Sequence, residues 1–267
     1  RDVIIIGGGH NGLVSAAYLA RRGLDVCVLE RRHLVGGAAV TEEMVPGFKF
    51  SRASYLAGLL RPQIIEDLQL AKYGFKYLPR DPSSFTPTHT DGPLGGKYLM
   101  LGSDGQKNWE SIAQFSRKDA DAYEKYEEFL GQVREVVTPL LDGPPPNPFE
   151  GGYHEKMATM RQASKLLSAA FRNRQVLVPF YELLTAPASH ILDRWFESEI
   201  LKATLATDAV IGAMAAPSQA GSAYVLLHHV MGEAAGKKGV WAYVEGGMGS
   251  ISNAIAQSAQ VHLRAPG

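Results

Sequence analysis

The first 39 residues, RDVIIIGGGHNGLVSAAYLARRGLDVCVLERRHLVGGAA, decide the fold of this chain. A run of β-branched residues, Val3 to Ile6, ends in three glycines and predicts a strand that is buried on both faces. Small and apolar residues then recur at helical spacing from His10 to Arg22, with Gly23 placed as a C-terminal cap. Residues 25–30 predict a second strand. Two parallel strands joined by one helix form a βαβ unit, so we expect an α/β sheet.

The glycines between the first strand and the helix fit the G-x-G-x-x-G pattern of dinucleotide-binding proteins. Gly7 permits the tight turn, Gly9 lets a pyrophosphate approach the backbone, and Gly12 lets the helix and the strand pack closely. An acidic residue, Glu30, ends the second strand and is placed to accept hydrogen bonds from a ribose hydroxyl. The strand, the helix and the acidic residue together indicate a dinucleotide rather than an empty glycine turn.

The residues after the second strand help to distinguish the nucleotides. The negative charge of Glu30 would repel a 2′-phosphate, which disfavours NADP, although Arg31 and Arg32 carry the charge that binds one. We interpret the two arginines as a solvated turn, with Arg31 lying over the adenine. A second glycine pair, Gly36 and Gly37, predicts another bare backbone segment close to the phosphate loop, which an NAD site does not require. The sequence therefore favours FAD over NAD.

The bulk composition limits the kinds of partner. The chain has 267 residues, of which 45% are hydrophobic, and Lys plus Arg equal Asp plus Glu at 27 each. No broad cationic field attracts nucleic acid or anionic lipid, so we expect a small neutral or apolar partner and no nucleic acid. Residues 201–217 are the most apolar long stretch, and Lys202 and Asp208 interrupt it, so no membrane span is predicted.

Thiol and metal chemistry are not expected. Cys27 is the single cysteine and lies in an apolar run, so we interpret it as a small buried packing residue. The adjacent His228 and His229 point to different sides of a helix or strand and make a poor metal site. We expect His10 near the cofactor, without a catalytic role.

The remainder of the chain predicts an insertion into the first domain. A helix is expected from Pro62 to Tyr73, hairpins from Tyr77 to Leu101, and helical segments from His154 to Met214 after a linker at Gly143–Gly152. The segment VWAYVEGGMGSISNAIAQSAQ then repeats the order of strand, glycines and helix, with the helix following Gly249. A long helix is expected between about Asn108 and the linker, and we interpret its tyrosines as core residues. Its apolar stripe consists of Tyr123, Tyr126, Phe129, Leu130, Val133, Val137 and Leu140. The predicted domains are 1–76 for the first part of the FAD-binding domain, 77–238 for a helical substrate domain, 239–262 for the return to the FAD-binding domain, and 263–267 for an atypical tail.

Three stretches carry a family resemblance. Residues 2–43 resemble the extended FAD signature of the flavin amine oxidase and phytoene desaturase group, in which the glycine loop, the acidic residue and the glycine doublet recur together. Residues 47–62 resemble the segment that follows this signature in the desaturase branch. AAPSQAGSAYVLLHHVMG, followed by VWAYVEGGMGSI, resembles the stretch of that branch that leads into its glycine-glycine-methionine helix.

The resemblance implies a fold, an activity and a site. It implies an α/β, Rossmann-like FAD-binding domain of the glutathione-reductase type with an inserted, mainly helical substrate domain. It also implies an FAD-dependent oxidoreductase of mitochondrial location that transfers hydride from an apolar or amine-type small molecule to the flavin. Arg52 and Ser54 match a segment near the flavin as positioning groups, and no catalytic residue or metal ligand is assigned. The expected cofactor-binding residues are Gly7, Gly8, Gly9, Asn11, Gly12, Leu13, Glu30, Arg31, Gly36, Gly37 and Ala38.

The chain departs from the family pattern at two places. Ala38 stands where the family often has arginine after the glycine doublet. The chain ends AQVHLRAPG where the family continues with further strands and a C-terminal glycine-rich flavin motif, so it resembles a truncated form. We therefore expect residues 1–267 alone to expose unpaired strand edges, to bind FAD weakly or not at all, to lack turnover and to be poorly soluble.

Two other classes of function stay open from the sequence. One is a non-catalytic regulatory protein that binds a protein partner on the same fold, as the related GDP-dissociation inhibitors do. Gly12 and Glu30, which such relatives do not need, favour a bound cofactor instead. The other is an NAD-dependent dehydrogenase, against which Gly36 and Gly37 count.

Overall fold

The chain folds into two compact units. The computed structural model describes residues 1–89, 91–141, 146, 147, 149 and 151–263. The first unit comprises Arg1–Arg80 and Gly232–Gly267 and is discontinuous in sequence, and the second comprises Asp81–Met231. The domain boundaries predicted at 76/77 and 238/239, and the roles given to each segment, stay predictions.

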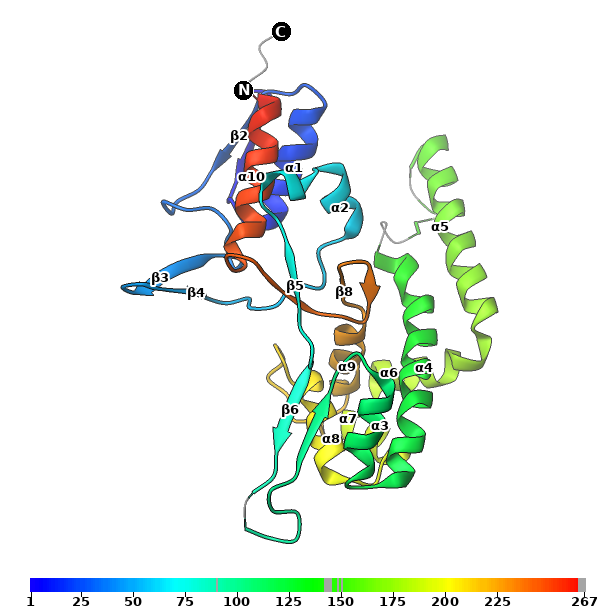
Figure 1. The fold of residues 1–267 in the computed structure, drawn as a ribbon. Helices are drawn as coiled ribbons and strands as arrows, with labels where there is room; N and C mark the ends of the chain where they lie inside the picture. Colours follow the sequence, from blue (N-terminus) through cyan, green and yellow to red (C-terminus); the bar gives the residue numbers. More distant parts are fainter. Residues whose placement is uncertain (90, 142–145, 148, 150, 264–267) are drawn as a thin grey trace. The chain divides into compact units, whose positions relative to one another are not determined.

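The first unit opens with a parallel βαβ element (Figure 1). Strand β1 (Val3–Ile6) pairs in parallel with β2 (Val26–Leu29), and helix α1 (His10–Arg21) connects them. The expectation that the first strand is buried on both faces is wrong, because Ile4 is 59% exposed and Ile6 is 88% exposed. Among the described residues β1 pairs with β2 alone, and α1 packs against these strands, so alternate side chains of β1 stay exposed.

The core of this unit forms where α1 packs against α10 (Gly249–Leu263), the last helix of the described chain (Figure 1). α10 begins at Gly249, where the sequence predicted the helix after the glycine pair. Small residues such as Ala17 and Ala254, both fully buried, let the two helix backbones approach closely. Larger side chains fill the space around them, including Leu13, Ile251 and Ile255. The two segments of the discontinuous unit are thus joined by a shared apolar core.

The helix predicted from Pro62 to Tyr73 is interrupted. Helix α2 covers only Pro62–Asp67, and a 3-10 helix follows at Leu70–Tyr73. Between them Gln69 adopts a left-handed conformation with φ +51°. Both flanking residues, Leu68 and Leu70, are buried. An unbroken helix would direct positions two apart to different sides, whereas the kink at Gln69 lets both leucines reach the core.

The remaining strands form short antiparallel pairs. The region Tyr77–Leu101 was predicted as hairpins, and within its described residues only the strands at Ser84–Pro87 and Tyr98–Leu101 pair with each other. Its first strand joins the segment near the C-terminal end of the first unit instead. The pairs are β3 (Thr41–Val45) with β4 (Phe48–Ser51), β5 (Tyr77–Pro79) with β10 (Ala242–Val244), β8 (Glu233–Ala234) with β9 (Lys237–Lys238), and, in the second unit, β6 (Ser84–Pro87) with β7 (Tyr98–Leu101).

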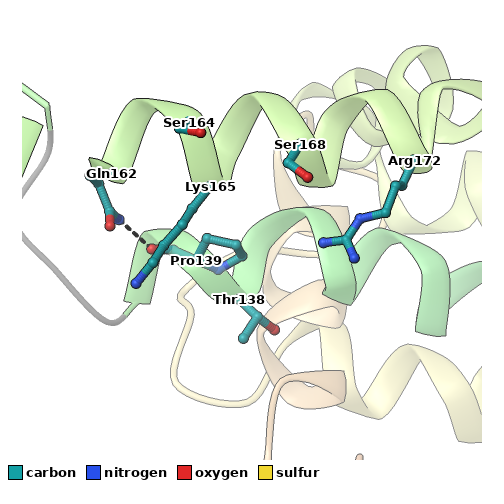
Figure 2. Close-up of a pocket in the computed structure, with 7 residues that line it drawn as sticks. All are labelled: Thr138, Pro139, Gln162, Ser164, Lys165, Ser168 and Arg172. Carbon is teal, nitrogen blue, oxygen red and sulfur yellow. Dashed lines mark hydrogen bonds between the residues drawn. The ribbon is translucent and has the colours of Figure 1, made fainter. Parts of the chain in front are cut away.

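The second unit is mainly helical, as predicted. Its two longest helices, α4 and α5, lie against one another, and the Gln162 side-chain amide on α5 donates to the Pro139 carbonyl on α4 (Figure 2). The helices of this unit are α3 (Gly105–Ala113), α4 (Arg117–Leu141), α5 (Tyr153–Arg172), α6 (Leu177–Thr185), α7 (Ala188–Trp195), α8 (Glu199–Ala206) and α9 (Ser222–Val230).

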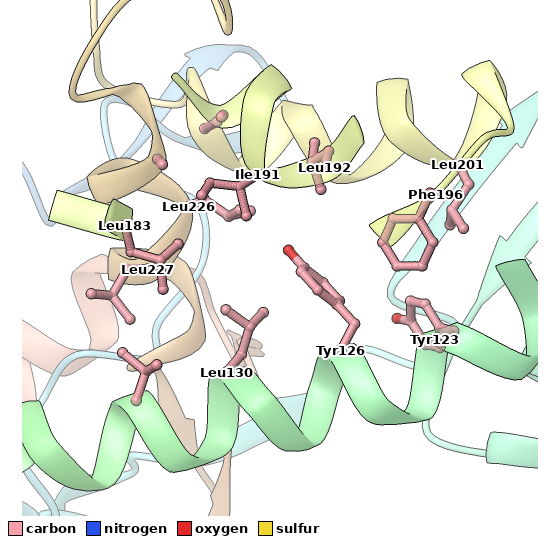
Figure 3. Packing of buried hydrophobic residues seen from close by; sticks show 14 of the residues in the cluster. Tyr123, Tyr126, Leu130, Leu183, Ile191, Leu192, Phe196, Leu201, Leu226 and Leu227 are labelled. Carbon is pink, nitrogen blue, oxygen red and sulfur yellow. The ribbon is translucent and has the colours of Figure 1, made fainter. Parts of the chain in front are cut away.

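The predicted apolar stripe of α4 forms the centre of the helical core (Figure 3). Tyr123, Tyr126, Leu130 and Val133 are buried against residues of α6, α7, α8 and α9. The Tyr126 ring meets Phe196 edge to face, with ring centroids 5.1 Å apart. The interpretation of these tyrosines as core residues is confirmed. The side chain of the last predicted stripe residue, Leu140, lies outside the described residues, as does much of the predicted linker at Gly143–Gly152.

The thiol and the histidine pair have no metal-binding arrangement in the described part of the chain. That part holds no group of three or more His, Cys, Asp and Glu side chains that could hold a metal ion. Cys27 is partly exposed, which contradicts its prediction as a buried packing residue. In the described part of the chain β2 pairs with β1 alone, so its other edge has no strand beside it. The rings of His228 and His229 lie nearly perpendicular, 5.8 Å apart.

A search of the described helices for a membrane-crossing segment found none with the required length and apolarity.

Candidate cofactor-binding site

The two glycine-rich loops of the first unit lie side by side. The Gly36 backbone N–H donates to the Gly8 carbonyl oxygen at 2.7 Å, and Gly9 and Gly36 form a parallel β-bridge. Gly37 follows directly, so that a Cβ built on it would lie 3.2 Å from the Gly9 Cα. The sequence indicated that the second glycine pair approaches the first loop, and the structure brings the two backbones into contact.

Two of these glycines are required by the fold itself. A Cβ on Gly12 would lie 2.3 Å from the Gly7 carbonyl oxygen, so only glycine lets α1 start so close to the loop. Gly36 has φ +129°, and a Cβ there would lie 2.3 Å from the Ala39 carbonyl oxygen. Substitutions at these two positions would disturb the protein with or without a ligand.

Gly9 is different, because nothing in the protein requires it. Its backbone is in the ordinary extended region, with φ −71°, and the nearest atom to a Cβ built there is the Gly37 Cα at 4.0 Å. A Cβ on Gly9 would make only this one van der Waals contact, so the described residues leave room beside Gly9. A bare backbone next to open space fits the close approach of a pyrophosphate.

The first turn of α1 faces this space without a protein cap. Gly9 is the N-cap residue, no side chain caps the helix, and the first turn contains no acidic residue. Helix N-termini carry unsatisfied N–H groups and a partial positive charge, which together bind phosphate. Asn11 is exposed on this turn, whereas Leu13 is buried in the core and its N–H donates to the Gly9 carbonyl. The side chain of Leu13 therefore supports the helix from behind.

Glu30 holds the phosphate loop from the end of β2. Its Oε2 accepts from the Gly8 N–H at 2.8 Å, and its Oε1 accepts from the Arg32 N–H at 2.9 Å. These backbone donors, first Arg32 and then Gly8, lower the pKa of the Glu30 carboxyl, which is ionised at neutral pH. A carboxylate has about four lone-pair directions, so two backbone bonds leave acceptor capacity for a ribose hydroxyl. The sequence predicted the ribose contact and did not predict the contact with Gly8.

An ion-pair network borders the loop. Glu42 on β3 accepts from Arg32 at 2.7 Å and from Arg52 at 3.1 Å. These two guanidinium groups lower the pKa of the Glu42 carboxyl. Arg52 was predicted to position the flavin, and the structure shows that it is held by Glu42. No sequence signal distinguishes Glu42, since it is one of two adjacent glutamates on a strand.

The other predicted residues lie on or beside these loops. Arg31, Gly37 and Ala38 are exposed, and Ser54 is half-buried. Their contacts with a cofactor, like those of the whole predicted set, stay predictions.

The residues present fit FAD. The open space beside Gly9 and the uncapped first turn of α1 suit the pyrophosphate, and the ionised Glu30 suits the adenosine ribose. The second glycine backbone, at Gly36 and Gly37, adjoins the same space. These features define a dinucleotide-binding unit of the Rossmann type.

Comparison with known proteins identifies the family. The sequence profile of the family described as FAD dependent oxidoreductase matches residues 2–178. The chain therefore belongs to this family, and FAD is its cofactor.

Individual relatives agree with the family. The chain is 54% identical over 266 residues to pyridine nucleotide-disulfide oxidoreductase domain-containing protein 2 of Rattus norvegicus, covering 98% of the chain and 46% of the relative. It is 40% identical over 146 residues to a component of the limonene dehydrogenase of Castellaniella defragrans, covering 54% of the chain and 26% of the relative. A solved structure of a putrescine oxidase mutant matches with a TM-score of 0.54 at 16% identity, covering 98% of the chain and 50% of that structure, and supports the fold. Nearly all of the chain matches the rat protein, but the chain spans only about half of that protein's length.

Proposed function

We propose that the protein removes hydrogen from an apolar small molecule and that the helical unit, Asp81–Met231, contributes the substrate domain. The observation that carries the proposal is the pair of glycine loops beside the uncapped α1, which suits FAD. Bound FAD supplies the acceptor for a hydride, and the protein binds, orients and excludes water. Similarity to the limonene dehydrogenase component, whose name indicates a hydrocarbon substrate, supports an apolar substrate.

The described residues of the site have binding rather than proton-transfer roles in this proposal. Gly9 and the first-turn amides of α1 hold the pyrophosphate, and Glu30 accepts from the ribose while it fixes the loop through Gly8. Glu42 keeps Arg32 and Arg52 in place at the border of the site. Removing hydrogen from an apolar carbon–carbon unit requires no dedicated acid–base pair, so binding and orientation are the tasks left to these side chains.

The test begins with the full-length protein and its visible absorption spectrum. We expect one FAD per chain, measured by releasing the flavin from denatured protein and quantifying it by chromatography. Loss of the oxidised-flavin band under anaerobic conditions then reports substrate oxidation. We expect bleaching with a cyclic terpene or a polyene and none with their saturated analogues.

Two outcomes would redirect this proposal. Bleaching by primary amines, but not by hydrocarbons, would assign an amine substrate to the same flavoprotein. A full-length protein that stays colourless after refolding with excess FAD, or that holds FAD and reduces it with no substrate class, would favour the non-catalytic, partner-binding alternative.

We also propose a mitochondrial location, which rests on the resemblance of the sequence to its family. Fractionation of cells that express the full-length protein with a C-terminal tag tests it. Co-purification with a matrix marker is the expected result, and recovery in the cytosol would contradict it.

A further inference from the structure

Helix α5 exposes an apolar stripe along one side. Met160, Leu167 and Phe171 are 65%, 71% and 72% exposed, and their spacing places them on one face of the helix. The opposite face carries the buried Ala169 and packs against α4. Three large apolar side chains that line one solvent-facing side of a helix are typical of an interaction surface.

A basic stripe runs beside the apolar one. Arg161, Lys165 and Arg172 are exposed, and their spacing places them on a neighbouring face of α5. The helix has four basic residues and one acidic residue, Glu155, although the whole chain has equal numbers of each charge. Within the described residues, none of these three cations forms an ion pair with an acidic side chain. The excess positive charge is therefore available to an anionic partner.

A groove of about 400 Å³ lies along the basic side of α5, between this helix and the end of α4. The Lys165 ammonium and the Arg172 guanidinium extend from α5 toward α4, and Thr138 and Pro139 form the facing wall (Figure 2). Ser164 and Ser168 add hydroxyl groups to the lining. Two cations with the Ser168 hydroxyl between them (Figure 2) match the oxygens of a phosphodiester.

We propose that α5 binds the surface of a membrane that contains anionic phospholipids. The headgroup phosphate enters the groove at Lys165 and Arg172, while Leu167 and Phe171 enter the boundary with the acyl chains. A lipid matches both stripes, whereas a soluble phosphate would leave the apolar side chains in water. A helix with cations on one face and Phe, Leu and Met on the next is the pattern of interfacial helices. The inference is independent of the substrate proposed above.

Flotation with lipid vesicles tests the electrostatic half of the proposal. We expect the full-length protein to float with vesicles that contain phosphatidylglycerol and to stay behind with pure phosphatidylcholine. The double variant Lys165→Ala, Arg172→Ala should bind about 10- to 30-fold more weakly, since each basic residue near such a surface contributes a several-fold factor. The matched control Arg117→Ala, Lys125→Ala removes the same charge from exposed positions on α4 and should bind as the wild type does. Equal binding by the two double variants would overturn the proposal.

A second pair of variants tests the apolar half. Leu167→Ser with Phe171→Ser should weaken binding even at low salt, whereas Ile211→Ser with Met214→Ser, also exposed in the helical unit, should not. An environment-sensitive label at Leu167→Cys, in a full-length background with Cys27 and any other native cysteine replaced by serine, should brighten and shift to the blue when vesicles are added. Circular dichroism confirms that each variant is folded.

Other occupants of the surface give distinguishable results. A label at position 167 that is already shielded without vesicles, and that does not respond to them, would show that another segment of the full-length protein covers the stripe. Binding of inorganic phosphate that is lost in the Lys165→Ala, Arg172→Ala variant, without any vesicle binding by the wild type, would assign the groove to a soluble phosphate compound. Either result would overturn the proposal.

Discussion

Two helices of the first unit begin directly after glycine-rich turns, and their first turns are used differently. α1 follows Gly7 to Gly9 and has no side-chain cap. At α10 the Gly249 N–H donates to the Thr41 hydroxyl at 2.9 Å, and the Met248 N–H donates to the Ser51 hydroxyl at 3.1 Å. These two hydroxyls come from a cross-strand pair of the β3–β4 hairpin.

The difference shows what makes a glycine–helix motif a phosphate site. In both helices, glycines after a strand let the backbone lie close to a neighbouring segment. The sequence does not show which group accepts hydrogen bonds from the N–H groups at the start of each helix. At α10 protein hydroxyls take that place, and a Cβ on Gly249 would lie 2.7 Å from the Thr41 nitrogen. At α1 the corresponding space is open. The first helix is therefore arranged for a ligand and the second for packing.

The largest expected effect concerns Gly9. Gly9→Val should abolish FAD retention in the full-length protein, because its side chain fills the open space that the pyrophosphate needs. The ratio of flavin to protein absorbance after gel filtration measures retention. Gly131→Val, on α4 where a Cβ would meet nothing within 4 Å, is the control and should keep its FAD. Equal flavin content in the two variants would show that the start of α1 does not bind the pyrophosphate of FAD.

Gly12→Ala should act on the fold. Its Cβ would meet the Gly7 carbonyl at 2.3 Å, and forcing α1 away from the loop should lower the free energy of unfolding by about 1–3 kcal/mol. Chemical denaturation of the flavin-free protein measures this change. Gly9→Ala should leave the denaturation midpoint of the flavin-free protein unchanged. A loss of stability in both variants would contradict the conclusion that the fold requires Gly12 but not Gly9.

Glu30→Gln should weaken FAD binding by about 10-fold at neutral pH, as expected when an ionised acceptor is replaced by a neutral one. The variant should also change the dependence of stability on pH. Because the folded pKa of Glu30 is depressed, its contribution is present above its ordinary value of 4.5 and is lost as the pH falls through the folded pKa. The melting temperatures of the flavin-free wild type and variant should therefore become equal as the pH is lowered. A difference in melting temperature that stays constant across this pH range would show that the charge of Glu30 does not stabilise the loop.

Thr41→Ala should have the smallest effect. Loss of the hydroxyl that caps α10 should reduce the free energy of unfolding by about 1 kcal/mol, and Thr41→Ser should restore it. FAD retention should stay at the wild-type level in both variants. Flavin loss in Thr41→Ala, with rescue by serine, would instead place the start of α10 in the cofactor site.

The sequence predicted the elements that depend on local pattern. The βαβ opening, the start of α10 at Gly249 and the tyrosine core of α4 all follow from periodicity and from glycine placement. The juxtaposition of the two glycine loops was also predictable, because a second bare backbone has few uses apart from close approach.

Features that depend on contacts between distant segments were not predictable. The break at Gln69 serves two leucines that both need the core, and no turn residue marks it. β5 pairs with β10, more than 150 positions further along the chain, rather than with its neighbour. Thr41, Ser51 and Glu42 acquire their roles only when the hairpin meets α10 and the arginines. A single sequence contains no local sign of such pairings.

The packing of α1 against α10 has a consequence for biosynthesis. The Ser252 hydroxyl donates to the Ala39 carbonyl, which joins segments separated by the whole helical unit. At the usual pace of translation, α10 emerges from the ribosome roughly 10 to 40 seconds after the βαβ element. The compact helical unit contains its own core and can fold during this interval, whereas α1 waits with its apolar side uncovered. During this interval the βαβ element should therefore depend on chaperones more than the helical unit does, although it is made earlier.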